Sequence, residues 1–169
     1  MLFRSRPSYL KIASIRKLLP DIPLLAVTAS ATPEVQKDIQ EKLEFKHGKL
    51  FKASFLRPNL AFSVLKTEAK PESLITLLKK ENESAIVYCR SRRQTVEIAS
   101  FLQMHRINSD FYHAGLSSEE RNTKQEAWIN NSIRVIVCTN AFGMGIDKPN
   151  VRLVVHYDIP DCLENYYQE

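Results

Sequence analysis

The sequence predicts an α/β fold, a parallel sheet with helices on both faces. Apolar runs of strand length alternate with segments of helical period along most of the chain, which is typical of such sheets. The run 135–138 is apolar throughout, whereas a half-exposed strand would alternate apolar and polar residues. The 169 residues are 44% apolar and 25% charged, a globular balance that can bury a core without disulfides or metal.

The first third of the chain predicts one helix among candidate strands. The helix begins at Thr32-Pro33, with Thr32 as N-cap and Pro33 at the first helical position, and runs to about Leu43. The candidate strands are 24–27, 50–55 and 61–65. The last two flank Arg57-Pro58-Asn59.

The remainder alternates regularly between helices and strands. The predicted strands are 85–89, 109–112, 135–138 and 153–156. The predicted helices are 71–80, 91–105, 117–128 and one that starts with a capping-type sequence at Asp161. Ser91 with Gln94, and Ser117 with Glu120, have the spacing of a capping box. A loop of about a dozen residues separates the last two strands.

We expect two parts, 1–57 from a neighbouring domain and a fuller unit at 58–169. The helix predicted at Asp161 has no stop signal before Glu169, which indicates truncation. The sequence shows no internal repeat.

The composition excludes two kinds of nucleotide site. The four glycines are Gly48, Gly115, Gly143 and Gly145, and none precedes Lys-Ser/Thr as a Walker A loop requires. The Gly-x-Gly-x-x-Gly dinucleotide pattern is also missing. The chain is therefore not expected to hold a triphosphate in a P-loop of its own.

Charge and cysteines narrow the class further. Lys and Arg outnumber Asp and Glu by 24 to 19, which suits an anionic partner, although a solvated basic surface explains the charge equally well. Cys89 and Cys138 lie in apolar runs and are expected to be small buried hydrophobes, and no Cys/His spacing indicates a metal site. The odd cysteine count, the lack of a signal peptide and the lack of an apolar run near 18 residues predict a soluble intracellular chain without membrane contact.

Three predicted strands end in segments of similar chemistry. Hydroxyls, basic groups or glycines occur at 88–92, 113–115 and 139–145. Ligands of open parallel sheets bind outside the carboxyl ends of the strands, and helix amino ends attract phosphate. A row of such ends would follow a polyanionic backbone. Alternatively, Ser91 and Ser117 are ordinary helix caps and the glycines ordinary turns. Likewise, the small hydroxyl residues of 28–32 could contact phosphate, bridge two domains or only cap a helix.

Several segments together resemble superfamily 2 helicases, specifically the RecQ DNA helicase family, over almost the whole chain. The similar segments are 25–33 (motif III), 57–60 (the joint between two lobes), 86–92 (motif IV), 112–116, 141–151 (motif V), 158–160 and 166–169 (the run into motif VI). Motif V, Ala-Phe-Gly-Met-Gly-Ile-Asp-Lys-Pro-Asn-Val, is the most specific. DEAD-box RNA helicases usually have Ala-Arg-Gly-Ile-Asp there. The chain departs from the pattern at Ser30, where Thr is common, and at 3–9, where extra residues interrupt a Phe-Arg-Pro-x-Tyr segment.

The resemblance implies the end of a first RecA-like lobe at 1–57 and most of a second, P-loop NTPase-type lobe at 58–169, without its own P-loop. The parent would be an ATP-dependent DNA helicase, moving 3′ to 5′ in repair and recombination, in the bacterial cytoplasm or the eukaryotic nucleus. Its ATP and Mg²⁺ would need the first lobe in cis. Since the P-loop lysine, the magnesium carboxylate and the arginine finger lie outside this sequence, it predicts no catalytic residue, no bound cofactor and no ATP hydrolysis by this chain alone.

The resemblance also assigns roles to residues. The expected contacts to single-stranded or partly duplex DNA are Ser91, Arg92, His113, Gly115, Thr139 and Asn140. The expected residues of the ATP site and its coupling are Thr28, Ser30, Gly145, Asp147 and Gln168. Asp147 would bind the ribose, or alternatively stabilise a turn before Lys-Pro. Trp128 and Met144 are candidates for base stacking, although the apolar neighbours of Trp128 favour a core position, and Phe142 fits either loop packing or a functional contact.

Three other functions remain open at this point. One is the second lobe of a DEAD-box-like RNA helicase, and another is a stand-alone nucleic-acid-binding module. The third is a small-molecule enzyme, which would require a partnered acid or base at His113 or Cys89.

Overall fold

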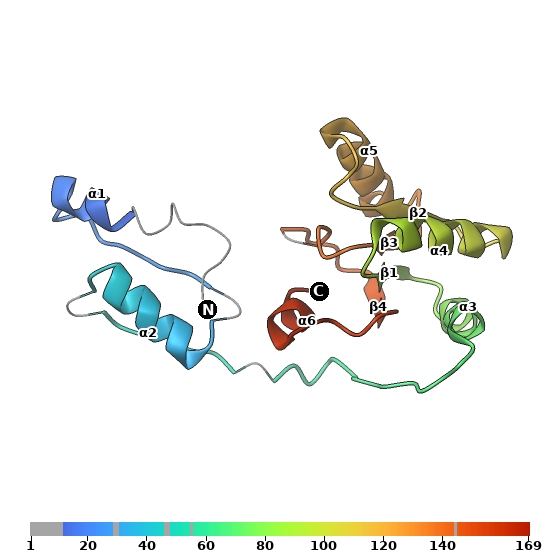
Figure 1. The fold of residues 1–169 in the computed structure, drawn as a ribbon, viewed down its shortest axis with the longest axis horizontal. Helices are drawn as coiled ribbons and strands as arrows, with labels where there is room; N and C mark the ends of the chain where they lie inside the picture. Colours follow the sequence, from blue (N-terminus) through green and yellow to red (C-terminus); the bar gives the residue numbers. More distant parts are fainter. Residues whose placement is uncertain (1–11, 29–30, 46–47, 55, 144) are drawn as a thin grey trace. The chain divides into compact units, whose positions relative to one another are not determined.

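The computed structural model describes residues 12–28, 31–45, 48–54, 56–143 and 145–169 (Figure 1). The chain forms two compact units, Met1–Phe62 and Ser63–Glu169. They divide a few residues after the boundary expected between Arg57 and Pro58. Each unit is described by itself.

The first unit contains two helices, α1 (Ile12–Leu18) and α2 (Pro33–Lys42). The Thr32 hydroxyl accepts a hydrogen bond from the Val35 N–H at 3.4 Å, so the predicted start of α2 is confirmed. All residues of α2 are partly or fully exposed. Leu43, which directly follows the helix, is buried.

The predicted strands of 24–27, 50–55 and 61–65 are wrong for the residues that the structure describes, which exclude Phe55. These segments have no strand ladder, and Leu25 and Val27 are 81% and 84% exposed. An apolar run becomes a strand only where a neighbour satisfies its backbone N–H and C=O groups. None of the described residues of the first unit supplies that neighbour.

The second unit is built on a four-stranded parallel sheet, which confirms the predicted fold class. Its strands are β1 (Ser84–Tyr88), β2 (Ser109–Tyr112), β3 (Val135–Cys138) and β4 (Val151–His156). The order across the sheet is β2-β3-β1-β4. β1 is central, with Tyr88 opposite Cys138 on one side and His156 on the other. Two strands are shifted from their predicted bounds: β1 begins and ends one residue earlier than expected, and β4 begins two residues earlier.

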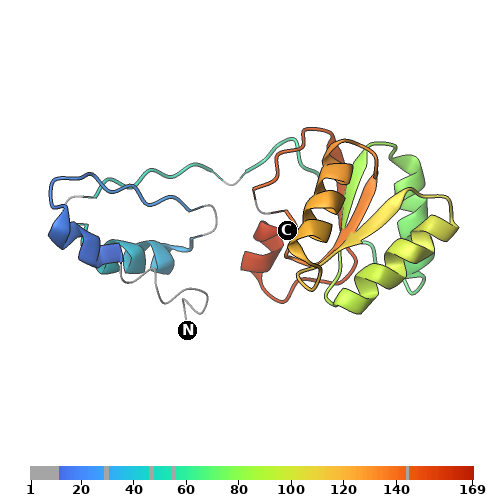
Figure 2. The same cartoon turned by 90° about the horizontal axis from the view of Figure 1, so that it is seen from above.

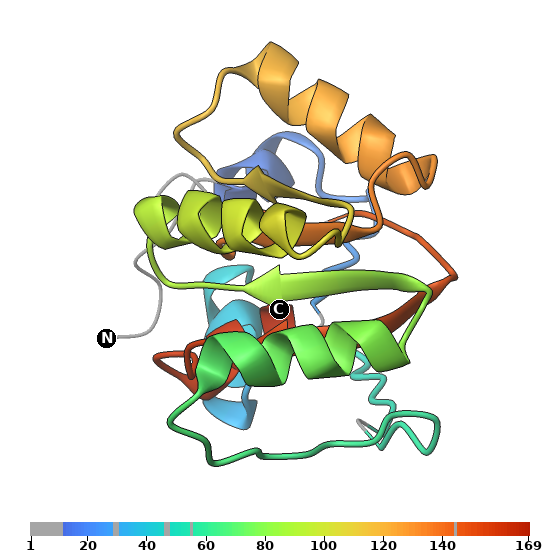
Figure 3. The same cartoon turned by 90° about the vertical axis from the view of Figure 1, so that its right-hand side faces the viewer.

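Four helices complete this unit: α3 (Lys70–Lys80), α4 (Arg92–Met104), α5 (Ser118–Ile129) and α6 (Leu163–Gln168). α3 and α4 lie on one side of the sheet and α5 on the other (Figures 2 and 3). On the first side, Leu78 and Leu102 pack with Val87 and Val137. On the other, Trp128 and Phe142 pack with Ile136.

Two of the aromatic candidates, Trp128 and Phe142, pack on the α5 side of the sheet. Trp128 is 1% exposed and lies in the core, as predicted, and Phe142 packs in edge-to-face geometry against it and against Tyr112. Met144 lies outside the described residues. Cys89 and Cys138 are buried free thiols, also as predicted.

Two of the predicted helix starts differ from the sequence expectation. Ser117 forms the complete capping box with Glu120, whereas at Ser91 only half of the predicted box forms, with Ser91 Oγ accepting from the Gln94 N–H. The cap expected from Asp161 is wrong, because α6 starts after Cys162 without a side-chain cap bond. The Asp161 carboxylate pairs instead with the Arg90 guanidinium.

Candidate functional site

The carboxyl ends of three neighbouring strands meet at one edge of the sheet. Tyr112 on β2 is in register with Cys138 on β3, which is in register with Tyr88 on β1. Backbone hydrogen bonds continue this alignment beyond the strands, from the Cys89 N–H to Cys138 O and from the Thr139 N–H to Tyr112 O. The sheet therefore brings together the three segments that were predicted to share a ligand.

The segment after β1 joins the segment after β2 through Arg92 and Gly115. Ser91 and Arg92 are exposed at the amino end of α4. A Cβ atom added to Gly115 would lie 2.8 Å from Arg92 Nη1 and 3.3 Å from Arg92 Cδ, so the arginine passes directly over the glycine backbone. This geometry holds a guanidinium beside backbone groups at two strand ends.

His113 lies between these exposed residues and the core. Its ring is half-buried and stacks with Phe111 at a centroid distance of 5.6 Å. Nδ1 is buried and has no hydrogen-bond partner in the part of the chain that the structure describes. The side chain is therefore packed by its neighbours rather than oriented by a partnered acid, which does not favour a general base.

The loop between β3 and β4 is held at its start by Tyr88. The Tyr88 hydroxyl donates to Phe142 O at 3.2 Å, and a Cβ on Gly143 would lie 2.7 Å from that hydroxyl. Gly143 and Gly145 have φ angles of 111° and 76°, which glycine adopts without strain. Thr139 and Asn140, at the beginning of the loop, line a pocket at the ends of β1, β3 and β4, which is called the strand-end pocket below.

A lysine fixes the other end of this loop. Lys148 Nζ donates to Ile129 O at 2.9 Å and to Asn131 Oδ1 at 2.7 Å, and it lies 5.1 Å from the centre of the Trp128 ring. Burial lowers the pKa of Lys148. Asp147, next to it, is exposed. The loop thus has two anchored ends with Gly145 and Asp147 between them.

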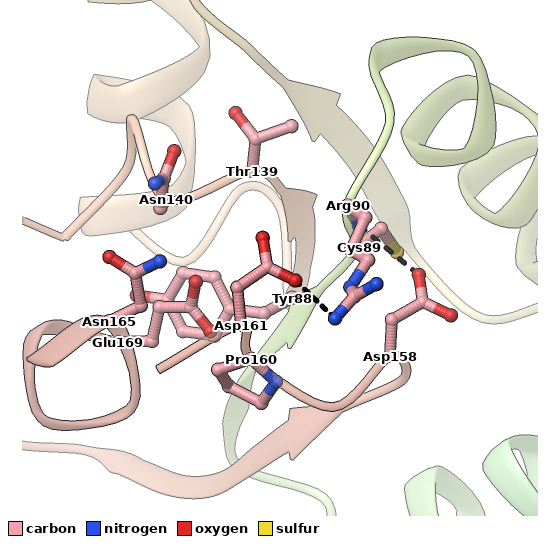
Figure 4. Close-up of a pocket in the computed structure, with 10 residues that line it drawn as sticks. All are labelled: Tyr88, Cys89, Arg90, Thr139, Asn140, Asp158, Pro160, Asp161, Asn165 and Glu169. Atoms are coloured by element: carbon pink, nitrogen blue, oxygen red, sulfur yellow. Dashed lines mark hydrogen bonds and ion pairs between the residues drawn. The ribbon is translucent and has the colours of Figure 1, made fainter. Parts of the chain in front are cut away.

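A pocket lies at the ends of β1, β3 and β4 (Figure 4). Its lining residues are Tyr88, Cys89, Arg90, Thr139, Asn140, Asp158, Pro160, Asp161, Asn165 and Glu169. Three of them are carboxylic acids and only one is a cation. This part of the strand-end edge is therefore acidic, unlike the Arg92 side, and the row of phosphate sites predicted from the sequence does not extend evenly along it.

The cation of the pocket, Arg90, is engaged by the segment that follows β4. Its Nε and Nη2 donate to Ile159 O at 3.1 and 2.8 Å, Nη2 pairs with Asp161, and its backbone N–H donates to Asp158 Oδ2 at 3.1 Å. Sequence reasoning did not find these contacts. Arg90 has the same residue type as Arg92, two positions further on, and no local pattern indicates that Arg90 has a partner 71 residues away.

Burial shifts the pKa of three groups in or beside this pocket, Cys89, Glu169 and His156. It raises the pKa of Cys89 to about 12, with a smaller contribution from Asp158, so the thiol is protonated at neutral pH. It also raises the pKa of Glu169, to which the charge of Asp161 adds, and lowers that of His156. A protonated, buried Cys89 does not support the small-molecule enzyme that would use it as a nucleophile.

The residues expected at the ATP site are divided between the two units. Gly145, Asp147 and Gln168 belong to the second unit, and Gln168 is the last residue of α6. Thr28 is exposed in the first unit, and Ser30 lies outside the described residues. Among the described residues, no group of three or more His, Cys, Asp or Glu side chains could hold a metal ion. Likewise, no helix in the described ranges is long and apolar enough to cross a membrane.

Comparison with known proteins places these features among helicases. The profile of the helicase conserved C-terminal domain matches residues 69–169. Protein R290 of Acanthamoeba polyphaga mimivirus is 43% identical over 99% of this chain and 31% of its own length. Its name describes it as an ATP-dependent RNA helicase. RecQ-like DNA helicase blm-1 of Caenorhabditis elegans is 41% identical over 97% of this chain and 17% of its own length. The chain thus spans less than a third of each relative.

Solved structures agree on the fold. The Saccharomyces cerevisiae protein Dbp5 bound to RNA and ADP BeF3 superposes with a TM-score of 0.74, covering 98% of this chain and 45% of that one, at 19% sequence identity. This likeness concerns the arrangement of the sheet and its helices.

Proposed function

Because the chain belongs to the helicase conserved C-terminal domain family, in its RecQ-like branch, we propose that it supplies the second motor lobe of an ATP-dependent DNA helicase. In this role, the lobe holds one DNA strand by its phosphates and closes against a first lobe when ATP binds between them. The observation that carries the proposal is the alignment of three strand ends, with Arg92 lying over Gly115 at their edge.

The strand contacts proposed are Ser91, Arg92, His113, Gly115, Thr139 and Asn140. Arg92 supplies the charge, and backbone N–H groups of the first turn of α4 that the Ser91 cap does not use supply neutral donors for phosphate oxygens. Phosphate contacts carry no sequence information, which suits an enzyme that moves along any sequence. Because the pocket beside Thr139 and Asn140 is acidic, we expect most of the attraction for phosphate on this surface to come from Arg92.

The ATP contacts proposed are Gly145 and Asp147 in the anchored loop and Gln168 in α6, with Thr28 and Ser30 as coupling residues of the other lobe. Asp147 is exposed between two fixed loop ends, so its carboxylate can accept from a ribose hydroxyl without reorganising the loop. Mg²⁺ and the reacting phosphates would be held by a P-loop and carboxylates that the 169 residues lack. We therefore expect no ATP hydrolysis by this chain alone. The 3′ to 5′ direction is part of the same proposal.

Binding of a fluorescent single-stranded oligonucleotide, measured by anisotropy over a range of salt, tests the DNA contacts. We expect weak binding that falls steeply with salt, and a loss of about threefold to tenfold in Arg92→Ala. Lys79→Ala, the same charge change at the exposed end of α3, should have little effect. Equal losses in the two variants would contradict the proposed surface, and ATP turnover by the purified chain would contradict the role of a half-motor.

An RNA-unwinding motor is the second candidate, because R290 carries an RNA helicase name. The same anisotropy assay distinguishes the DNA motor from the RNA motor when the affinities for DNA and RNA oligonucleotides of one sequence are compared. A lobe that distinguishes RNA does so through the 2′-hydroxyl, so tighter RNA binding at equal salt would favour this candidate.

A further inference from the structure

Arg90 and Asp161 form an ion pair in the wall of the strand-end pocket. Arg90 directly precedes Ser91 and Arg92, and the pocket it lines also includes Thr139 and Asn140. Figure 4 shows the Asp161 carboxylate directed at the Arg90 guanidinium, with Thr139 and Asn140 on the opposite side of the pocket. Arg90 follows β1, which lies between β3 and β4 in the sheet, so Arg90 lines the same sheet edge as the proposed contacts that follow β1 and β3.

Two different groups hold the Arg90 side chain. Ile159 O accepts from both Nε and Nη2, and it is a neutral backbone acceptor. The Asp161 carboxylate is a charged acceptor on a side chain that is 71% exposed, while that of Arg90 is 57% exposed. If the carboxylate left, the carbonyl would still orient the guanidinium.

The Asp161 contact is readily exchanged. Ion pairs between exposed side chains contribute only about 0–1 kcal/mol. Arginine donates five N–H groups in a planar fork that matches phosphate. Glu169 lines the same pocket, and after burial the charge of Asp161 is the second cause of the raised pKa of Glu169, so these two carboxylates repel each other. A phosphate in place of Asp161 would meet a guanidinium that is already oriented.

We propose that Arg90 is a further phosphate contact of the single strand and that Asp161 masks it, so that strand binding requires the phosphate to displace the carboxylate. This inference rests on the proposed nucleic-acid function of the strand-end surface. Asp161 then acts as a built-in competitor, which weakens binding while it remains in place. Arg92, without such a partner at its guanidinium among the described contacts, binds in either state.

A double-mutant cycle on the 169-residue chain tests the mask with an oligo-dT single strand. Asp161→Asn should tighten binding by about threefold or more at low salt. The slope of the logarithm of the binding constant against the logarithm of the salt concentration should become steeper by about 0.7, the value for one added phosphate contact of a single strand. Glu164→Gln, which removes one charge from an exposed site on α6, is the matched control and should change binding far less. In an Arg90→Met background, the gain from Asp161→Asn should disappear.

The outcomes separate this inference from the proposed function. If the chain does not bind the single strand at all, the proposed function fails. The proposal that Asp161 masks Arg90 is wrong if the chain binds the strand but Asp161→Asn changes its affinity no more than Glu164→Gln does. It is also wrong if the gain in affinity from Asp161→Asn persists in the Arg90→Met background. Thermal unfolding of each variant verifies the fold, and Arg90→Lys, which keeps the charge but not the fork, should recover only part of the gain.

Discussion

The guanidinium of Arg92 lies over Gly115, so that even one added carbon on the glycine would come within 2.8 Å of Nη1. Gly115 has no positive φ angle, and its lack of a side chain serves this close approach instead. The contact is the physical link between the segments that follow β1 and β2.

Gly115→Ala should therefore displace Arg92 without unfolding the unit. The terminal guanidinium can move, so we expect a stability change within about 0.5 kcal/mol. Single-strand affinity should fall about as far as in Arg92→Ala, because the displaced charge no longer lies between two strand ends. Ala114→Gly is the control, because it changes an exposed neighbour by one carbon. Unchanged affinity in Gly115→Ala would mean that the position of Arg92 does not matter.

Gly143→Ala should destabilise the second unit more than Gly145→Ala does. Both require a positive φ, which costs about 1–2 kcal/mol for a residue with a Cβ, but only Gly143 also meets the Tyr88 hydroxyl. Urea unfolding measures both free energies. Tyr88→Phe alone should cost about 1 kcal/mol through the lost bond to Phe142 O, and less in the Gly143→Ala background, where it removes the clash. Equal costs in both backgrounds would refute the contact.

Lys148→Met should loosen the end of the β3–β4 loop. It removes the donor to Ile129 O and Asn131 Oδ1, for a loss of about 1–2 kcal/mol in the free energy of unfolding. Trp128 is the only tryptophan in the sequence and lies beneath Lys148, so acrylamide quenching of its fluorescence should increase. Lys80→Met, at an exposed helix end, provides the comparison. A variant as stable and as protected as the original chain would show that the loop does not need this anchor.

The thiols should react in two classes. Cys162 is exposed, whereas Cys89 and Cys138 are buried and burial raises the pKa of each. At pH 8 a disulfide reagent should modify one thiol quickly and the other two only after denaturant is added. Three fast thiols would be incompatible with the core described here.

Alkaline pH should also weaken the fold through the same two residues. In the unfolded chain a thiol loses its proton near the ordinary pKa of 9.0, while folded Cys89 keeps it up to about pH 12. The contribution of the protonated Cys89 thiol to the free energy of unfolding is therefore fully present below about pH 9 and decreases as the pH rises above it. Urea unfolding at pH 8 and pH 10 checks the direction, and Cys89→Ala should reduce the difference.

The sequence was sufficient for the elements whose signals are local. Ser91 and Ser117 mark helix starts because a cap depends on the next three residues, and an all-apolar run such as β3 needs burial on both faces. The strand predicted at 24–27 failed for the opposite reason, since its state depends on a ladder partner that local sequence does not reveal.

The candidate site was predictable in position but not in electrostatics. Residue types identified the strand-end segments, and the parallel order then placed them together. The acidic pocket escaped notice because Asp158 and Asp161 meet Arg90 only through the pairing of β1 with β4. For the same reason, the sequence named Arg92 but not Arg90 as a candidate, and it did not show that Arg90 is paired with Asp161 while Arg92 lies over Gly115.

The central place of β1 has a consequence for synthesis on the ribosome. β1 is the first strand of the sheet to be made, yet one of its hydrogen-bonding edges is completed only by β4, the last. Until Val151–His156 emerge, the nascent chain exposes a bare apolar edge of the kind that recruits other chains. Slow translation between β3 and β4 should therefore promote aggregation, and chaperone capture of this domain should peak in that interval.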